Sequence, residues 1–344
     1  MIFSQNIINW YSSNKRDLPW RRDRNPYSVW LSEIILQQTR IEQGTPYYYK
    51  FIENFPEVTD LADAEEEEVL KLWQGLGYYS RARNLHVTAQ DIRDNYGGQF
   101  PDNYKELKKL KGVGDYTASA ISSICFDEVQ AVLDGNVFRV LSRYFGVDLP
   151  INSSEGIKFF RQKAQSLAPS IGIGDYNQGL MDLGSRVCSP KKPTCEQCPL
   201  SKDCVAYLTN SQLDYPVKKG KVKVKEVYFY YLVIASDNGL MFRKRLEGIW
   251  KNMYEFPYIS SDSPISDLEL VRRVEAKYDI QIDNNGLTQI KEEVVHKLSH
   301  MKINGGFYAL TNAELPYKLY SYKEVEKLPV PVIISNFLKE YTVQ

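Results

Sequence analysis

The chain of 344 residues is long enough to fold into two domains, each with its own hydrophobic core. Its 43 basic and 43 acidic residues cancel, so the net charge neither supports nor excludes a polyanionic partner. The N-terminal residues lack the basic and apolar regions of a signal peptide, and no apolar run reaches the ~18 residues that a membrane span requires. We therefore expect a cytoplasmic protein with no membrane partner.

Residues 1–208 are predicted to form a helical domain. Apolar residues recur there at helical spacing, and short Gly, Pro and Asn runs separate the segments. The predicted helices include Ser28–Ile41, Thr45–Phe55, Glu65–Trp73, Arg81–Tyr96, Ser153–Ala168 and Asp175–Val187. In the first of these helices, Glu33 lies among Trp30, Ile34 and Ile35. Burial of a carboxyl group favours its neutral form, so Glu33 is a candidate proton donor.

The segment Leu107–Ala118 contains a G-x-G turn between a helix that ends near Leu110 and one that begins at Asp115. Gly112 and Gly114 permit positive φ and expose backbone amides at a helix N-terminus, which suits a phosphate. Three lysines add positive charge: Lys108, Lys109 and Lys111. The pattern favours a helix-hairpin-helix that grips a nucleic-acid backbone without reading its sequence, and a plain helix–helix turn is the alternative.

Asp134 follows an apolar stretch and precedes a predicted helix at Val137–Tyr144. Local rules make it a helix-capping aspartate, a position that keeps a carboxylate ionised. Taken alone, capping explains Asp134 as well as catalysis does. Together with Glu33, however, it forms a pair of carboxyl groups in opposite environments. Such a pair can cleave a glycosidic bond, because one group donates a proton and the other faces an oxocarbenium-like cation.

Four cysteines fall within seventeen residues at 188–204, with the spacing C-x6-C-x2-C-x5-C, and the remaining one is Cys125. Four thiolates that share a ligand bind an iron–sulfur cluster or zinc. Zinc sites usually show two short CxxC pairs and only one is present, so the spacing favours a [4Fe–4S] cluster. Zinc and a disulfide clasp remain alternatives. The four residues are Cys188, Cys195, Cys198 and Cys204.

Residues 209–225 carry a proline and five lysines and have the composition of a linker. Residues 226–344 are predicted to form an α+β domain, since aromatic and β-branched runs alternate with turn signals there. Its predicted elements are strands at Val227–Ala235 and Leu240–Arg245, a helix at Ile265–Tyr278, and further strands within Leu287–Leu310 that turn at Gly305-Gly306.

Jointly, the GVG hairpin, the aspartate twenty residues beyond Gly114 and the four-cysteine loop resemble the endonuclease III superfamily of DNA glycosylases. Within it, the chain is similar to the MutY-type adenine DNA glycosylases over essentially its whole length. The segments that carry this likeness are RDLPWR (Arg16–Arg21), SEIILQQT (Ser32–Thr39), LGYYSRARN (Leu76–Asn84), NQGLMDLGSRVC (Asn177–Cys188) and HKLSH (His296–His300). The fold that this implies is a mainly α helix-hairpin-helix glycosylase domain with an iron–sulfur loop, followed by an α+β Nudix-like domain.

The resemblance implies that Glu33 protonates the adenine leaving group at N7 and that Asp134 stabilises the sugar cation. Asn136 and Tyr116 would support Asp134, the tyrosine through a hydrogen bond to Asp134 or to the sugar region. Bifunctional relatives place a lysine at the position of Tyr116, and its amine forms a Schiff base. Base removal without efficient strand cleavage is therefore expected here.

The resemblance also implies contacts with a flipped base and with the duplex. The adenine pocket would be lined by Arg16, Trp20 and Gln178. The residues that enter the duplex beside the partner base would be Gln38, Tyr78 and Thr39.

The C-terminal part resembles the Nudix-like domain that the family uses to recognise 8-oxoguanine, including a Gly248–Pro257 stretch like its G-x-W…EFP segment. The helix at Leu268–Tyr278 lacks the REXXEE glutamates of a working Nudix hydrolase. Ser299 and His300 would read the oxidised base, with Leu298 where the family has Phe, and an ordinary polar turn is the alternative.

We therefore expect a bacterial, nucleoid-associated monomer that removes adenine opposite 8-oxoguanine or guanine in duplex DNA. Three other functions are possible: a glycosylase for oxidised or mispaired pyrimidines, a non-catalytic lesion-binding protein, and a nucleotide-pool hydrolase.

Overall fold

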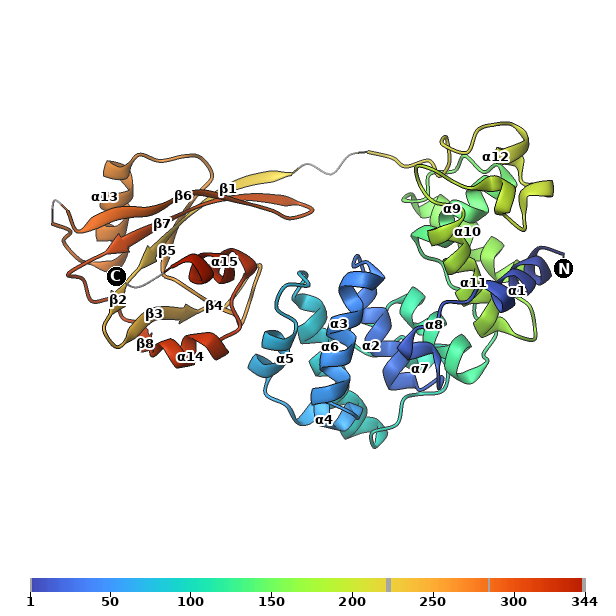
Figure 1. Cartoon of the computed structure of the whole chain (residues 1–344), viewed down its shortest axis with the longest axis horizontal. Helices are drawn as coiled ribbons and strands as arrows, with labels where there is room; N and C mark the ends of the chain where they lie inside the picture. The colour runs from blue at the N-terminus through green and yellow to red at the C-terminus, as the bar shows by residue number, and fades with distance from the viewer. Residues whose placement is uncertain (1, 221–223, 284, 342–344) are drawn as a thin grey trace. The chain divides into compact units, whose positions relative to one another are not determined.

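A computed structural model describes residues 2–220, 224–283 and 285–341 of the chain. It divides into two compact units (Figure 1). The first unit comprises residues 1–63 and 84–220, and the second comprises residues 64–83 and 221–344. None of the described helices is both long and apolar enough to span a membrane.

The first unit is built from helices around α11, which packs against α1, α8 and α9 and buries Tyr176, Leu180 and Leu183. The α-helices are α1 (Ile2–Asn14), α2 (Pro26–Leu36), α3 (Ile41–Asn54), α4 (Val58–Asp63), α6 (Ser80–Tyr96, whose first four residues belong to the second unit), α7 (Tyr104–Leu107), α8 (Asp115–Phe126), α9 (Gly135–Phe145), α10 (Ser154–Leu167), α11 (Ile173–Arg186) and α12 (Val205–Leu208). Three 3₁₀ turns are η1 (Pro19–Arg21), η2 (Cys195–Gln197) and η3 (Ser201–Asp203).

One predicted helix extends too far. The helix expected to reach Ile41 ends at Leu36, and the four residues 37–40 form a connection before α3 begins at Ile41. The apolar periodicity continued across the break because Ile41 belongs to the next helix. The break leaves Gln38 with a left-handed backbone (φ +58°), so a predicted DNA-contacting residue lies at the tip of a turn.

The second unit contains two sheets (Figure 1). The larger has the strand order β5-β1-β7-β6, in which β1 runs parallel to β7 and antiparallel to β5. The smaller joins β2, β3 and β4, and β8 pairs with β3. The strands are β1 (Lys225–Val233), β2 (Ala235–Ser236), β3 (Gly239–Lys244), β4 (Tyr254–Glu255), β5 (Tyr258–Ser261), β6 (Leu287–Lys297), β7 (Met301–Leu310) and β8 (Lys318–Tyr320). Its helices are α5 (Glu66–Leu72), α13 (Asp267–Tyr278), α14 (Tyr322–Lys327) and α15 (Val332–Glu340).

The larger sheet is covered on both faces. Leu232 of β1 lies in one apolar cluster with Leu270 of α13. The adjacent Tyr231 stacks on Phe307 of β7, whose ring lies 3.9 Å from that of Phe337 of α15. Because successive side chains of a strand point to opposite faces, α13 and α15 cover opposite sides. This explains the nearly continuous apolar run in β1.

The predicted turn at Gly305-Gly306 is wrong. Both glycines lie inside β7, where Gly305 pairs with Phe229 of β1. A Cβ atom at Gly305 would lie 3.0 Å from the Ile333 side chain of α15, so the glycine allows close approach of a helix. The turn between β6 and β7 falls at residues 298–300 instead, closed by the Leu298 amide donating to the Met301 carbonyl at 2.7 Å.

Residues 64–83 pack with the C-terminal unit, although the sequence prediction assigned them to the helical domain. Glu67 of α5 accepts hydrogen bonds from Lys244 and Tyr254, both at 2.7 Å. Lys71 donates to the Leu328 carbonyl at 3.0 Å. The division between the units falls after Gly220, inside the predicted linker, of which residues 221–223 lie outside the described part.

Candidate active site and cysteine loop

A cavity of about 730 Å³ in the first unit brings together nine of the predicted site residues. They come from the segment before α2, from α2 and the turn after it, from the start of α8, from the start of α9 and from α11. The nine residues are Arg16, Trp20, Glu33, Gln38, Thr39, Tyr116, Asp134, Asn136 and Gln178. Residues from five stretches of the sequence therefore share one concave surface, as an active site requires.

Glu33 opens onto this cavity and is otherwise surrounded by protein. Burial raises the pKa of its carboxyl group to about 7, and nearby Asp134 adds to the rise. A hydrogen bond from the Tyr116 hydroxyl at 2.6 Å and the charge of Arg21 oppose it. The expected upward shift is confirmed. Tyr116 was expected to bond to Asp134 or the sugar region, but its hydroxyl reaches Glu33 instead, and the Met181 sulfur lies 3.1 Å away.

Asp134 caps α9, as predicted. Its carboxylate accepts from the Val137 amide at 2.8 Å and from the Asn136 side chain at 2.7 Å. Arg139 in turn donates to the Asn136 side-chain oxygen at 2.8 Å, which fixes the orientation of the amide. That the carboxyl group of Asp134 is ionised stays a prediction. Burial raises the pKa of Asp134, and the hydrogen bonds from Val137 and Asn136 only reduce this rise.

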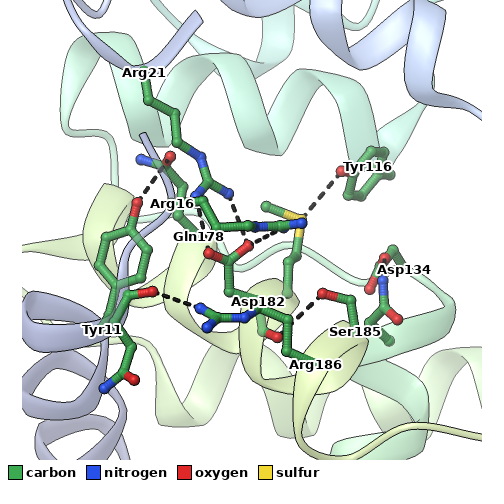
Figure 2. A network of polar contacts seen from close by, with 12 residues as sticks. Tyr11, Arg16, Arg21, Tyr116, Asp134, Gln178, Asp182, Ser185 and Arg186 are labelled. Atoms are coloured by element: carbon green, nitrogen blue, oxygen red, sulfur yellow. Dashed lines mark hydrogen bonds and ion pairs between the residues drawn. The ribbon is translucent and has the colours of Figure 1, made fainter. Parts of the chain in front are cut away.

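The cavity lining also contains a polar network that sequence reasoning missed (Figure 2). Arg16 and Arg21 both donate to the carboxylate of Asp182 in α11. Gln178, one turn earlier on the same helix, accepts from the Tyr11 hydroxyl at 3.2 Å. A signal existed in the sequence, because Asp182 stands four residues after Gln178 and so shares its helix face.

Gln38 and Tyr78, the two larger residues expected to enter the duplex, both adopt left-handed backbone conformations. The φ angles are +58° and +48°, which are uncommon for residues other than glycine. The guanidinium of Arg81 lies 5.8 Å from the Tyr78 ring and donates to the Gly77 carbonyl at 3.2 Å, so it supports the tip. Strained, exposed tips of this kind are common at functional sites.

Tyr78 belongs to the second unit, where it lines a cavity of about 540 Å³ together with Ser299 and His300. Leu298 is also part of this wall. Ser299 Oγ and His300 Nδ1 lie 3.4 Å apart, and both residues are exposed. The β6–β7 turn and the segment after α5 thus contribute to one surface.

The hairpin between α7 and α8 uses its two glycines differently. Gly112 has φ +78°, whereas Gly114 is extended and is the N-cap residue of α8. Of the two glycines that could adopt a positive φ, only Gly112 does so. Two of the three predicted phosphate-binding lysines are already engaged, since Lys108 pairs with Asp115 and Lys109 pairs with Glu106.

We predict that Gly112→Ala lowers the stability of the protein, whereas Gly114→Ala weakens only its binding to DNA. A Cβ atom at Gly112 would lie 2.8 Å from that of Asn84, in a left-handed conformation, so alanine there should lower the free energy of unfolding by about 1–2 kcal/mol. No atom of the described residues lies within 4 Å of a Cβ at Gly114, so that variant should keep its stability and lose only DNA affinity. Urea unfolding and duplex titrations measure the two effects. Equal stability losses would contradict this reading of the hairpin.

Arg143, a buried residue of α9, contacts the four-cysteine loop and holds its first part in place. Its guanidinium lies 3.3 Å from the Cys188 sulfur and donates to the carbonyls of Ser189 at 2.9 Å and Pro190 at 3.1 Å. All four thiols are half-buried and free of disulfide bonds. In the described part of the chain, no three His, Cys, Asp or Glu side chains form a group that could hold a metal ion.

The chemistry of the loop nevertheless fits a thiolate-bound group. Burial raises the pKa of the Cys198 thiol to about 12. A hydrogen bond from the Leu200 amide opposes this rise, and the charges of the three other cysteines nearby add to it. Burial also raises the pKa of Cys204, and the Tyr207 amide opposes this rise. If all four cysteines were ionised, their negative charges would repel one another, and the backbone amides would offset only part of this. Bound iron would stabilise the four thiolates because it neutralises their charge.

Loss of one cysteine should therefore remove the bound group. We expect Cys198→Ser protein to lose the brown colour, the iron and the sulfide of the wild type, and to be less stable to heat. Cys125→Ser is the matched control, since its thiol lies in α8 away from the loop, and it should keep all three. Iron analysis and visible absorption measure this. Zinc in place of iron in the wild type would contradict the choice of cluster.

Comparisons with known proteins identify relatives of this chain. A family model described as "HhH-GPD superfamily base excision DNA repair protein" matches residues 31–162. The adenine DNA glycosylase of Buchnera aphidicola subsp. Acyrthosiphon pisum is 36% identical over 355 residues, covering 98% of this chain and 98% of that protein. The adenine DNA glycosylase of Mus musculus is 43% identical over 214 residues, which are 60% of this chain and 42% of that protein.

Two solved structures resemble the helical part. A thermostable thymine-DNA glycosylase matches with a TM-score of 0.56 and 33% identity, over 60% of this chain and 96% of that one. Endonuclease III in a non-covalent complex with DNA matches with a TM-score of 0.52 and 20% identity, over 60% of this chain and 94% of that one. At this level of identity the match shows a similar fold. With a relative aligned over nearly its entire length, this chain belongs to the adenine DNA glycosylase family.

Proposed function

We propose that the protein acts in base excision repair, hydrolysing the N-glycosidic bond of adenine mispaired with 8-oxoguanine or guanine in duplex DNA. The observation that carries the proposal is Glu33, whose carboxyl group has a pKa near neutrality and opens onto a cavity shared with Asp134. A cavity of about 730 Å³ has room for one flipped purine nucleotide.

The chemistry follows from these two carboxyl groups. Glu33 donates its proton to N7 of adenine, the bond between the sugar C1′ and N9 breaks, and adenine leaves as a neutral base. The electron-deficient sugar is stabilised by the carboxylate of Asp134, which Asn136 and the Val137 amide hold in place. Water then adds to C1′, and the proton that it loses returns to the Glu33 carboxylate. Tyr116 orients the Glu33 carboxyl group through its hydrogen bond.

We also propose that the enzyme does not cleave the strand, because Tyr116 occupies the position where bifunctional relatives carry a lysine. Duplexes with adenine opposite 8-oxoguanine should yield breaks only after hot alkali. Breaks without alkali would overturn the monofunctional assignment. Duplexes with thymine opposite guanine provide the comparison substrate, since the similar solved structure is a thymine-DNA glycosylase. Excision of thymine alone would overturn the adenine assignment.

For the partner base, the cavity that contains Tyr78, Ser299 and His300 supports a role in 8-oxoguanine recognition by the Nudix-like domain. Ser299→Ala should reduce the preference for 8-oxoguanine over guanine about tenfold, because one hydrogen bond is lost. Ser263→Ala, in an exposed loop of the same unit, is the control. Single-turnover rates on the two mispairs give the ratio, and an unchanged ratio would exclude this role for Ser299.

Nucleotide hydrolysis by this domain is not supported. In α13, Glu269 pairs with Arg273 and Glu275 accepts from the Ile282 amide at 2.9 Å. These two glutamates therefore already have partners within the protein. A Mg²⁺-dependent assay on oxidised dGTP tests this directly.

A [4Fe–4S] cluster, held by Cys188, Cys195, Cys198 and Cys204, completes the proposal. When bound, such a cluster supplies one-electron redox chemistry, and four thiolates leave it no open coordination site. Its role in excision would then be to fix the loop that Arg143 contacts. We propose that the enzyme works as a monomer at the bacterial nucleoid, in the cytoplasm.

A further inference from the structure

Asp182 lies at the centre of the network on the wall of the adenine cavity (Figure 2). Its side chain is fully buried, and both carboxylate oxygens accept from arginines. Arg21 binds as a two-pronged fork, at 2.9 and 3.0 Å, and Arg16 shares one of the oxygens. Two guanidiniums on one carboxylate leave an excess positive charge at this wall.

Within the residues that the structure describes, the same network contains one buried hydrogen-bond donor without an acceptor. The Nε atom of Arg16 is buried and lacks a hydrogen-bond partner in the described part of the chain. Gln178 is 8% exposed, and its side-chain oxygen is occupied by the Tyr11 hydroxyl, which leaves its amide nitrogen as the available group. Arg21 is held over the Tyr11 ring, 5.7 Å from its centre. Buried donors without acceptors are costly unless a ligand satisfies them, and adenine carries ring-nitrogen acceptors.

We infer that Asp182 is the positioning residue of the adenine pocket, holding Arg16 and Arg21 as oriented donors and compensating part of their charge beside Glu33. This inference rests on the proposed function and deepens it. Asp182 touches neither substrate nor reacting atoms and acts through the two arginines. The bidentate geometry supports this, because a guanidinium fork fixes direction as well as distance.

The compensation has a measurable consequence, since Glu33 must be protonated to act. The charged and titratable groups around Glu33 are Tyr116 and Cys125 of α8, Asp134 at the start of α9, and Arg21 of η1. Removing the negative charge of Asp182 leaves Arg21 and Arg16 less compensated, which favours ionised Glu33 and lowers its pKa. The fall in rate on the alkaline side should then begin at lower pH.

The test is the pH profile of single-turnover adenine excision for the wild type, Asp182→Asn, Asp182→Glu and Arg21→Lys. Asp182→Asn should reduce the rate of excision about 100-fold, because the arginine donors are no longer held in place. It should also shift the alkaline decline in rate to lower pH by about one unit. Asp182→Glu, which restores the charge, should return this decline to its wild-type position. Arg21→Lys keeps the positive charge but loses the paired hydrogen bonds to Asp182. This variant should therefore excise adenine slowly, with the alkaline decline in rate at the same pH as in the wild type. Asp175→Asn, an exposed carboxylate of the same helix, is the control and should match the wild type.

An alkaline decline that stays in place or moves to higher pH in Asp182→Asn overturns the inference, as does an Asp182→Glu variant with the same defect. If Asp182→Asn fails to fold, as judged by circular dichroism, Asp182→Glu and Arg21→Lys still decide between charge and geometry. A wild type that excises no adenine, or shows no alkaline decline in rate, would instead refute the proposed function. The two failures are therefore distinguishable.

Discussion

Replacing Glu33 by glutamine will nearly abolish adenine excision and leave binding to the mispaired duplex largely intact. Glutamine has almost the same shape and can still accept the Tyr116 hydrogen bond, but it has no proton to give to the leaving base. General acid catalysis is worth about 10²- to 10⁴-fold in rate. Single-turnover excision and a duplex titration measure the two properties separately. A Glu33→Gln variant that still cuts at the wild-type rate would show that another group is the acid.

The pH dependence of the wild type gives an independent check on Glu33. The pKa of its carboxyl group is raised to about 7, so the protonated, active form dominates below that pH and is lost as the pH rises through it. Excision should therefore decline on the alkaline side of neutrality. Glu53→Gln, an exposed residue of α3, is the matched control and should keep both rate and profile. A flat profile through pH 7 would contradict the shifted pKa.

Replacing Asp134 by asparagine should lower the rate about 10²- to 10³-fold while preserving the fold. Asparagine caps helices as well as aspartate does and can still accept from the Val137 amide, so α9 should remain stable. What it lacks is the negative charge that faces the developing sugar cation. The measurement is single-turnover excision, with thermal unfolding as the check on the fold.

Asp148→Asn, at an exposed position after α9, is the control for Asp134→Asn and should behave like the wild type. If Asp134→Asn lost stability and rate together, capping would be its main role. If it kept its full rate, the cation would have to be stabilised by another group.

Much of the site could be predicted from the sequence because its signals are local. The apolar neighbours of Glu33 along one helix predicted its raised pKa, and the residues around Asp134 predicted its position at the cap of α9. The spacing of the four cysteines predicted a shared ligand without any tertiary information. Each of these signals depends on neighbours within about two helical turns or on a short loop.

The remainder depended on how distant segments pack. Asp182 lies 161 residues from Arg21, and Tyr116 lies 83 residues from Glu33, so no periodicity relates the members of either pair. The raised pKa of Asp134 comes from burial by surrounding elements. A helix-capping rule considers only neighbours in the sequence and therefore cannot predict this burial. Gly305 indicated a turn by composition, but it allows α15 to approach the sheet. Sequence alone determined the family and the candidate reacting groups, because these follow from residue type and local order. Tertiary structure decided the charge around those groups and the wall that positions the base, because both depend on segments that meet only when the helices pack.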